Sequence, residues 1–162
     1  IPHVLEGWAR GGAPADHDLD LGMMRVRNVP TDIRGGYEGI RRDGNSIFIF
    51  EAGGLCIGHL GHLHHMPDEA QFAAIGRLDV VMAAVDGGIT LDTASMIAVM
   101  ERLKARVVIP MHWFGRATLD RFLTGMDGGF DIVETGLGDI TLSLDRLPTR
   151  PQVVVLQPGP LD

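Results

Sequence analysis

The sequence has little positive charge and no long apolar run, and each shortage excludes a class of protein. Lys and Arg number 14 against 21 Asp and Glu, giving a net charge of −7, and no basic run offsets this balance. Nucleic acids and anionic lipid surfaces are bound by clustered Lys and Arg, so we expect neither a nucleic-acid partner nor a membrane partner. No stretch is apolar over the roughly 20 residues that a membrane-spanning helix needs.

The sequence has one cysteine, Cys56, which excludes an internal disulfide. Cys56 lies within an apolar run, so we interpret it as a small buried side chain rather than a nucleophile. A lone cysteine slightly favours the reducing cytoplasm and is also compatible with export. No signal peptide is visible. Because the chain begins at Ile1 rather than Met, we expect that an upstream segment has been removed, together with any targeting signal.

Several signatures of catalysis or architecture are also missing. The chain has no G-x-S-x-G nucleophile elbow, no phosphate-binding loop and no internal repeat. The segment 136–139, GLGD, resembles half of a dinucleotide-binding fingerprint, but it opens no predicted helix, so we interpret it as a turn. A length of 162 residues predicts one domain, or a piece of one.

Four of the seven histidines lie within seven positions of the stretch LCIGHLGHLHHM, residues 55–66. These histidines are His59, His62, His64 and His65. An apolar run leads into the stretch, and a second apolar run, VVIPMHW, delivers His112. Ligands of open α/β sheets bind beyond the carboxyl ends of the strands, so we expect the two strand ends to lie side by side. Asp32 and Asp86 follow two other predicted strands and are further candidates.

Apolar periodicity predicts alternating strands and helices. Strands are predicted over residues 23–30, 46–51, 55–59, 78–85, 107–111, 130–133, 140–144 and 153–157. Helices are predicted over residues 67–76, 92–102 and 117–126. A loop is predicted over residues 30–36, and a hairpin turn over residues 41–45, where Asp43-Gly44 suits positive φ. This order predicts an α/β fold with helices on a mixed sheet.

Imidazole and carboxylate are the usual ligands of Zn²⁺, Mn²⁺ and Fe²⁺ at catalytic sites. A bound divalent ion lowers the pKa of a water molecule toward neutrality and supplies a nucleophile. The sequence therefore predicts a metal site at the strand ends. In the alternative interpretation, the histidines bond backbone carbonyls around a structural loop, and the protein is a plain α/β domain that takes up no metal.

Three segments in this order resemble the metallo-β-lactamase fold superfamily. They are NSIFIFEAGGLCIGHLGHLHH, AAIGRLDVVMAAVDGGITLD and RLKARVVIPMHWF, within residues 45–114. Within the superfamily, they are similar to predicted zinc-dependent hydrolases related to ascorbate-6-phosphate lactonase. The resemblance implies a four-layer αββα sandwich, a divalent metal with zinc expected first and manganese or iron as alternatives, and a small-molecule substrate.

The resemblance also assigns metal ligands. His112 matches the terminal metal ligand, and His62 stands where the family's bridging Asp stands. His65 matches a histidine that often follows that Asp. Asp32 is the nearest ligand to the place of the family's middle histidine. We assign the remaining polar groups at these strand ends to substrate binding: His59, His64 and Asp86.

Two departures from the family pattern change the expected function. The H-x-H-x-D-H motif, which belongs to the N-terminal half of the sandwich, is absent, so residues 1–162 resemble only the C-terminal half. His62 also replaces a bridging anion with a neutral ligand. We predict a hydrolase of an ester, lactone or phosphoester, with a non-catalytic metal-binding or interaction module as the alternative. Apolar sheet surface is costly to expose, so we expect a homo-oligomer or pairing with the missing half.

Overall fold

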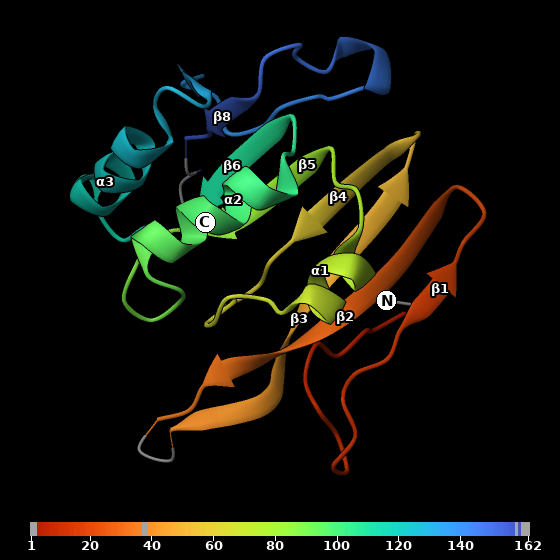
Figure 1. Ribbon diagram of the computed structural model, residues 1–162. Coiled ribbons are helices and arrows are strands. Elements are labelled where there is room, and N and C mark those ends of the chain that lie inside the picture. Colours follow the sequence, from red (N-terminus) through yellow and green to blue (C-terminus); the bar gives the residue numbers. More distant parts are fainter. Residues whose placement is uncertain (1–2, 37–38, 158, 160–162) are drawn as a thin grey trace.

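Three α-helices lie on one face of an eight-stranded sheet in the computed structural model, which describes residues 3–36, 39–157 and 159 (Figure 1). In chain order the elements are β1 (Asp18–Asp20), β2 (Met24–Arg34), β3 (Ile40–Ala52), β4 (Leu55–His59), α1 (Glu69–Ile75), β5 (Val80–Ala84), α2 (Thr93–Leu103), β6 (Val107–Met111), α3 (Arg116–Met126), β7 (Asp131–Glu134), a 3₁₀ turn (Leu144–Arg146) and β8 (Gln152–Val155). The predicted α/β class and all three predicted helices are confirmed.

The sheet is mixed, with strand order β1-β2-β3-β4-β5-β6-β8-β7. Strands β1 to β4 pair antiparallel as successive hairpins. From β4 onward, every neighbouring pair is parallel. Strands β4, β5 and β6 are therefore adjacent and point the same way, so their carboxyl ends meet at one edge. This edge carries the histidine stretch and His112.

Burial on both faces explains the continuous apolar runs of β5 and β6. Val81 and Val108 belong to the main core, under the helices. Val80, Val107 and Ile109 belong to a smaller core on the opposite face. A sequence that is apolar at successive positions can form such a strand because both faces exclude water.

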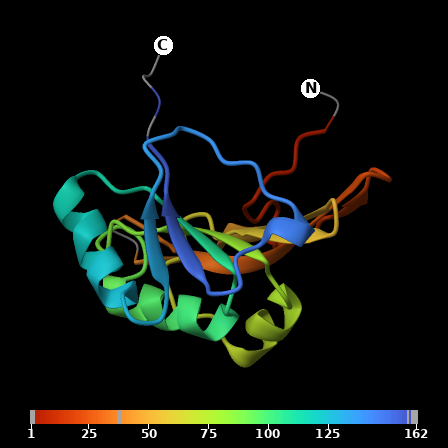
Figure 2. The same cartoon turned by 90° about the horizontal axis from the view of Figure 1, so that it is seen from above.

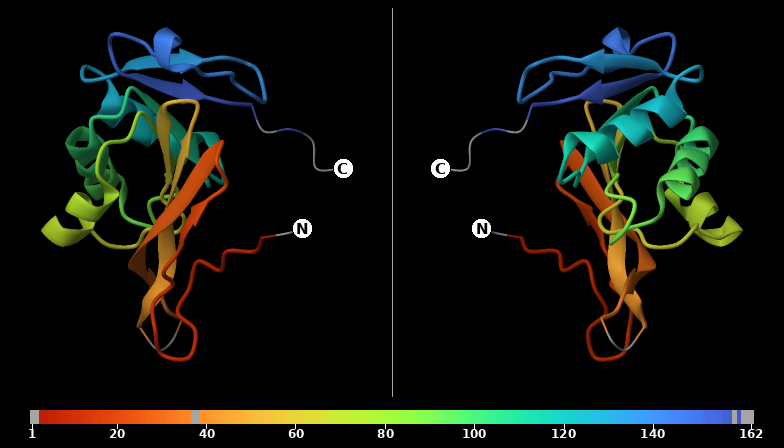
Figure 3. Two further views of the ribbon diagram at one scale, coloured as in Figure 1. Left: turned by 90° about the vertical axis from the view of Figure 1, so that its right-hand side faces the viewer. Right: turned by 90° about the vertical axis from the view of Figure 1, so that its left-hand side faces the viewer.

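The face without helices is covered in part by this chain's own loops (Figures 2 and 3). Ile140, Leu142 and Leu147, from the connection between β7 and β8, pack on the smaller core. Ile57 and Met82 remain half-buried on that face. The described residues thus form one sheet with one helical layer, which is two of the four layers expected.

Three local predictions were wrong. The predicted loop at 30–36 is strand as far as Arg34, and the predicted turn at 41–45 lies inside β3. Asp43 does adopt a positive φ of 50°, but it lies in an irregularity of the β2–β3 pairing rather than in a turn. A bulge and a hairpin turn both accept such a residue, so Asp-Gly alone does not distinguish them. The predicted strand at 140–144 instead uses its apolar residues to cover the sheet.

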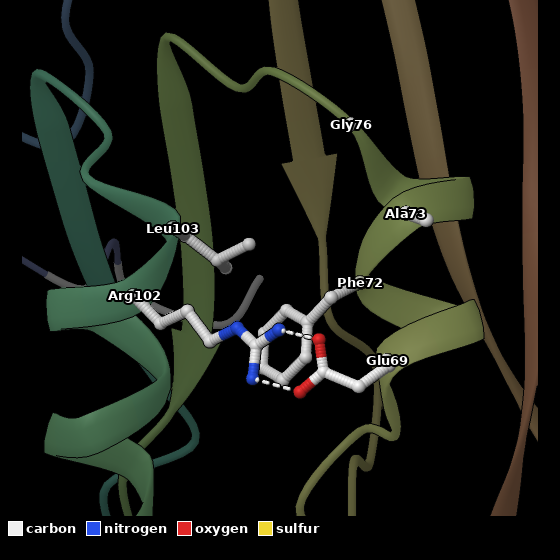
Figure 4. Close-up of a pocket in the computed structure, with 6 residues that line it drawn as sticks. All are labelled: Glu69, Phe72, Ala73, Gly76, Arg102 and Leu103. Atoms are coloured by element: carbon white, nitrogen blue, oxygen red, sulfur yellow. Dashed lines mark hydrogen bonds and ion pairs between the residues drawn. The ribbon is translucent and has the colours of Figure 1, made fainter.

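Helices α1 and α2 are joined at the surface by a charged clamp (Figure 4). Arg102 donates two hydrogen bonds to Glu69, at 2.8 and 2.5 Å, and its guanidinium lies 3.8 Å from the ring centre of Phe72. A hollow of about 290 Å³ adjoins the clamp and is lined by none of the histidines. The clamp is exposed, and we give it a structural role only. Among the described residues, no helix is long and apolar enough to cross a membrane.

Two leucines that differ in burial test the position of the core. Leu119 on α3 is 0% exposed, whereas Leu137 is 62% exposed. We expect Leu119→Ala to lower the free energy of unfolding by about 2–5 kcal/mol, because it leaves a cavity under the sheet. The matched Leu137→Ala should change it by less than about 0.5 kcal/mol. Urea unfolding measures both, and equal losses would contradict the assigned core.

Candidate metal centre

The carboxyl ends of β4, β5 and β6 bring together groups that are far apart in the sequence. The parallel register places Ile57 beside Val80, and Met82 beside Ile109. The loops that follow the three strands carry the histidine stretch, Asp86 and His112 respectively. The expected convergence at one sheet edge is therefore confirmed.

His112 and His62 form the centre of this edge. Their ring centres are 4.4 Å apart, with the ring planes at 74°. His112 has a φ of 55°, in the left-handed region that non-glycine residues rarely adopt. The ring of Phe114 meets the ring of His112 edge to face, with the ring centres 4.8 Å apart. This backbone geometry, held by the surrounding contacts, turns His112 toward the histidine loop at the end of β6.

Asp86 orients His112. Its Oδ2 lies 3.0 Å from His112 Nδ1 and accepts a hydrogen bond from the hydroxyl of Thr90 at 2.6 Å. Its Oδ1 accepts bonds from the backbone N–H groups of Gly88, Ile89 and Thr90. A neutral His112 that donates from Nδ1 leaves Nε2 free as a ligand, and a carboxylate behind a histidine is the usual support for metal ligation.

The chemistry around Asp86 keeps its carboxyl ionised. Burial raises the pKa of the carboxyl, but the hydrogen bonds from Thr90, Gly88 and Ile89 outweigh burial and hold the pKa well below its usual range. The side chain is only 3% exposed and its oxygens are already bonded. Asp86 therefore positions His112 and the 88–90 loop, and its assignment to substrate binding stays a prediction.

Asn45 anchors the histidine loop, and it was not among the residues predicted for the site. Its Oδ1 accepts the backbone N–H of His62 at 2.8 Å. Its Nδ2 donates to Thr31 Oγ1 at 2.8 Å and to the carbonyl of Leu60 at 3.2 Å. Asn45 and Thr31 are both buried. Thr31 and Asn45 are paired within β2 and β3, and only this pairing, which depends on the strand register, identifies the anchor.

His65 and Asp32, two further predicted metal ligands, form a second hydrogen-bonded pair. The backbone N–H of Asp32 donates to His65 Nε2 at 3.1 Å, so the neutral ring carries its proton on Nδ1. His65 Nδ1 lies 2.9 Å from the carbonyl of Met66. Both ring nitrogens are thus engaged in this structure, and the role of His65 as a metal ligand stays a prediction. Asp32 lies within β2, and its Oδ1 accepts the N–H of Asp43 at 3.0 Å.

The two remaining histidines of the stretch differ from each other. His59 Nδ1 accepts the N–H of Gly61 at 3.1 Å. Burial, and to a lesser degree the neighbouring His62, lower the pKa of His59, so its ring is neutral at pH 7. His64 has a buried Nδ1 with no hydrogen-bond partner among the described residues. Such an orphaned atom is uncommon in folded proteins.

The donor set fits a divalent metal in kind but not in number. His62 and His112 supply two imidazoles, and Asp86 supplies the support that a metal-binding histidine needs. Within residues 3–36, 39–157 and 159, no group of three or more His, Cys, Asp or Glu side chains could hold a metal ion. Catalytic zinc sites have three protein ligands and an open position. The described residues therefore provide part of a site.

Replacing Asp86 tests its positioning role. We expect Asp86→Asn to lower the free energy of unfolding by about 1–3 kcal/mol at pH 7, because an amide nitrogen cannot accept the bonds of Thr90 and His112. The folded carboxyl has a lowered pKa, so this stabilisation is present above the unfolded pKa of about 4 and is lost as the pH falls below it. Urea unfolding at pH 7 and pH 3 measures the difference.

The exposed Asp139 is the control for Asp86, because Asp139→Asn should leave stability unchanged at both pH values. An Asp86→Asn protein as stable as the native protein at pH 7 would contradict the role of this carboxylate.

Two glycines separate backbone strain from the anchor of the histidine loop. Gly61 and Gly53 have φ of 60° and 57°, so alanine at either position costs roughly 1–2 kcal/mol. A Cβ at Gly61 would also collide with Asn45 Oδ1, whereas a Cβ at Gly53 meets nothing. We expect Gly61→Ala to be the more destabilising in urea unfolding, by a further ~1–3 kcal/mol. Equal effects would show that Asn45 does not anchor the loop.

Comparisons with known proteins agree with this architecture. A family model described as "Beta-lactamase superfamily domain" matches residues 1–112. A protein named as a metal-dependent hydrolase, from Hyperthermus butylicus, is 24% identical over 154 residues. The match covers 93% of this chain but 56% of that relative, so the chain spans little more than half of its length.

Solved structures of similar fold include two metallo-β-lactamase fold proteins. A candidate zinc-dependent hydrolase of the metallo-β-lactamase superfamily, from Thermotoga maritima, has a TM-score of 0.66 and 27% identity, and the match covers 89% of this chain and 70% of that one. The metallo-β-lactamase fold protein YhfI of Bacillus subtilis has a TM-score of 0.54 at 8% identity, and the match covers 88% of this chain and 51% of that one. The chain therefore belongs to the metallo-β-lactamase superfamily.

Proposed function

We propose that this protein is the metal- and substrate-binding half of a metal-dependent hydrolase. The observation that carries the proposal is the pairing of His62 with His112, whose ring is held by the buried Asp86. An ionised carboxylate that bonds one imidazole nitrogen directs the other nitrogen outward as a ligand. The names of the relatives from Hyperthermus butylicus and Thermotoga maritima support the same activity.

In this proposal, each residue of the centre has a separate role. His62 and His112 hold a divalent ion, for which imidazole favours zinc, with manganese or iron as alternatives. Such an ion, when bound, lowers the pKa of a water molecule and polarises the scissile bond. Asp86 keeps the His112 ring in place, and Asn45 holds the backbone that presents His62. The substrate is a small molecule with an ester, lactone or phosphoester bond.

The further ligands would come from outside the described cluster. Two imidazoles are fewer than the three protein ligands of a catalytic zinc site. The face of the sheet without helices leaves Ile57 and Met82 half-buried, and such apolar surface favours a covering layer. We propose that a segment related to the other half of the family fold supplies both the cover and the ligands, with a second copy of this chain as the alternative.

A second candidate function is a non-catalytic metal-binding or interaction module. The observation that favours it is His62, which stands at the position of the family's bridging carboxylate. A neutral imidazole neutralises less positive charge than an anion does, so it disfavours two adjacent metal ions. A module of this kind would bind one metal and turn over no substrate.

Metal binding and turnover, measured on the same variants, test the two candidates. We expect zinc binding in calorimetric titration, weakened at least about tenfold in His62→Ala and in His112→Ala, because each removes an imidazole ligand. The exposed His3 provides a matched control, and His3→Ala should bind zinc as the native protein does. Hydrolysis of an ester, a lactone and a phosphoester should require metal and fall in the same two variants.

Tight zinc binding without turnover on any of the three substrates would favour the module. Zinc uptake no greater than that of the His62→Ala variant would contradict both candidates.

A further inference from the structure

Two hollows flank the histidine pair, one on each side. The first has a volume of about 350 Å³ and is bordered by His62 and His59. Trp8, Asn45, Ser46 and Phe48 are among its other lining residues. The second, also about 350 Å³, is bordered by His112 and Trp113. Each hollow offers a ligand a space beside one of the two histidines.

Neither hollow is lined by a charged side chain among the described residues. Phosphate groups are recognised by arginine or lysine, most effectively through the paired donors of a guanidinium. The arginine closest in sequence to the first hollow's lining, Arg34, lines a separate hollow and donates to the carbonyl of Gly88 at 2.7 Å. The space beside the histidine pair therefore suits an uncharged ligand better than a phosphoester.

His59 gives the first hollow one directed polar donor. Gly61 N–H donates to Nδ1 of His59, so the neutral ring must carry its proton on Nε2. Nε2 has no hydrogen-bond partner among the described residues and is not a fully buried, unpaired atom. With Nδ1 occupied and Nε2 protonated, His59 is a hydrogen-bond donor rather than a metal ligand. Its natural partner is a neutral acceptor such as a carbonyl oxygen.

Apolar and aromatic residues form much of the rest of the first hollow, together with the neutral polar Asn45 and Ser46. Trp8 is 49% exposed, so a large part of its indole is accessible to a ligand. The ring of Phe48 is nearly parallel to that of His17, with the ring centres 6.1 Å apart. Pockets that combine apolar walls with a few placed polar groups are typical of small-molecule sites.

We propose that the hollow between Trp8 and His59 binds a neutral carboxylic ester or lactone through an apolar group, with the substrate carbonyl accepting the His59 Nε2 proton. This inference rests on the proposed hydrolase function and selects among its substrates. In the reaction, the oxygen of water bonds to the carbonyl carbon and the carbon–oxygen bond to the alcohol breaks. The alcohol oxygen leaves with a proton, and the acid is the other product.

Binding without turnover tests the substrate class. The chain has two tryptophans, so Trp113→Phe leaves Trp8 as the only tryptophan, a reporter of the first hollow, and Trp8→Phe leaves Trp113 as the reporter of the second; excitation at a wavelength selective for tryptophan excludes the one tyrosine. The probes are N-methylphenylacetamide, a neutral carbonyl compound that resists hydrolysis, and phenyl phosphate. We expect the amide to change Trp8 emission saturably and to bind at least about tenfold more tightly than phenyl phosphate, because burying an uncompensated charge is costly.

The role of the His59 proton is tested in the Trp113→Phe background. His59→Phe keeps a ring but removes the donor, and should weaken amide binding about fivefold, the usual size of one hydrogen bond. His59→Gln places an amide N–H near the position of Nε2 and should restore most of the affinity. Far-ultraviolet circular dichroism confirms that both variants fold.

The outcomes separate this inference from the proposed function. Tighter binding of phenyl phosphate, an amide signal at Trp113 alone, or unchanged affinity in His59→Phe would overturn the inference, even if the protein hydrolyses esters. Amide binding with the expected variant effects would support it, even if no substrate is turned over and the hydrolase proposal fails.

Discussion

The hydrogen bond between Asp86 and His112 is the interaction on which the candidate site depends. It joins the loops after two adjacent parallel strands, β5 and β6. The carboxylate can play this part because Thr90 and three backbone N–H groups offset the cost of burying its charge. Once fixed in this way, it holds a histidine whose backbone has a left-handed conformation and sets that ring against His62.

Competition for ring nitrogens then decides which histidines are available as ligands. Each imidazole has two nitrogens, and a backbone group that bonds one of them fixes the proton on the other. His65 is engaged at both nitrogens, and His59 is fixed as a donor, whereas His62 makes no ring hydrogen bond among the described residues. Histidines that look alike in the sequence therefore differ in which ring nitrogens the surrounding backbone already bonds.

The two faces of the sheet are covered unequally in the part of the chain that the structure describes. The sheet has helices on one face, and short loops cover part of the other. At one edge of this sheet, the described residues supply two imidazoles, His62 and His112, and the supporting carboxylate of Asp86. The proposals of a covering layer and of additional ligands follow from this geometry.

Much of the fold could be predicted because buried positions are apolar and recur at the spacing of a strand or a helix. The apolar runs of β4, β5 and β6 and the capped, periodic helix α2 formed nearly where they were predicted. The placement of candidate groups after these strands followed from one rule about strand ends. Where a residue type serves two structures, the prediction failed: Asp43 suited a turn but lies in a strand irregularity, and the apolar residues 140–144 cover a sheet rather than join it.

The sequence by itself determined the strand and helix pattern, the superfamily, and the convergence of His62 and His112 at one edge, because these depend on apolar periodicity and strand direction. Only the tertiary structure decided what each polar group does there. Asn45 bonds the backbone of the histidine loop, Asp86 bonds the ring of His112, and His65 bonds the backbone of Asp32. Such roles depend on which hydrogen-bond partners long-range packing brings within about 3 Å. Spacing along the chain does not show which partners these are.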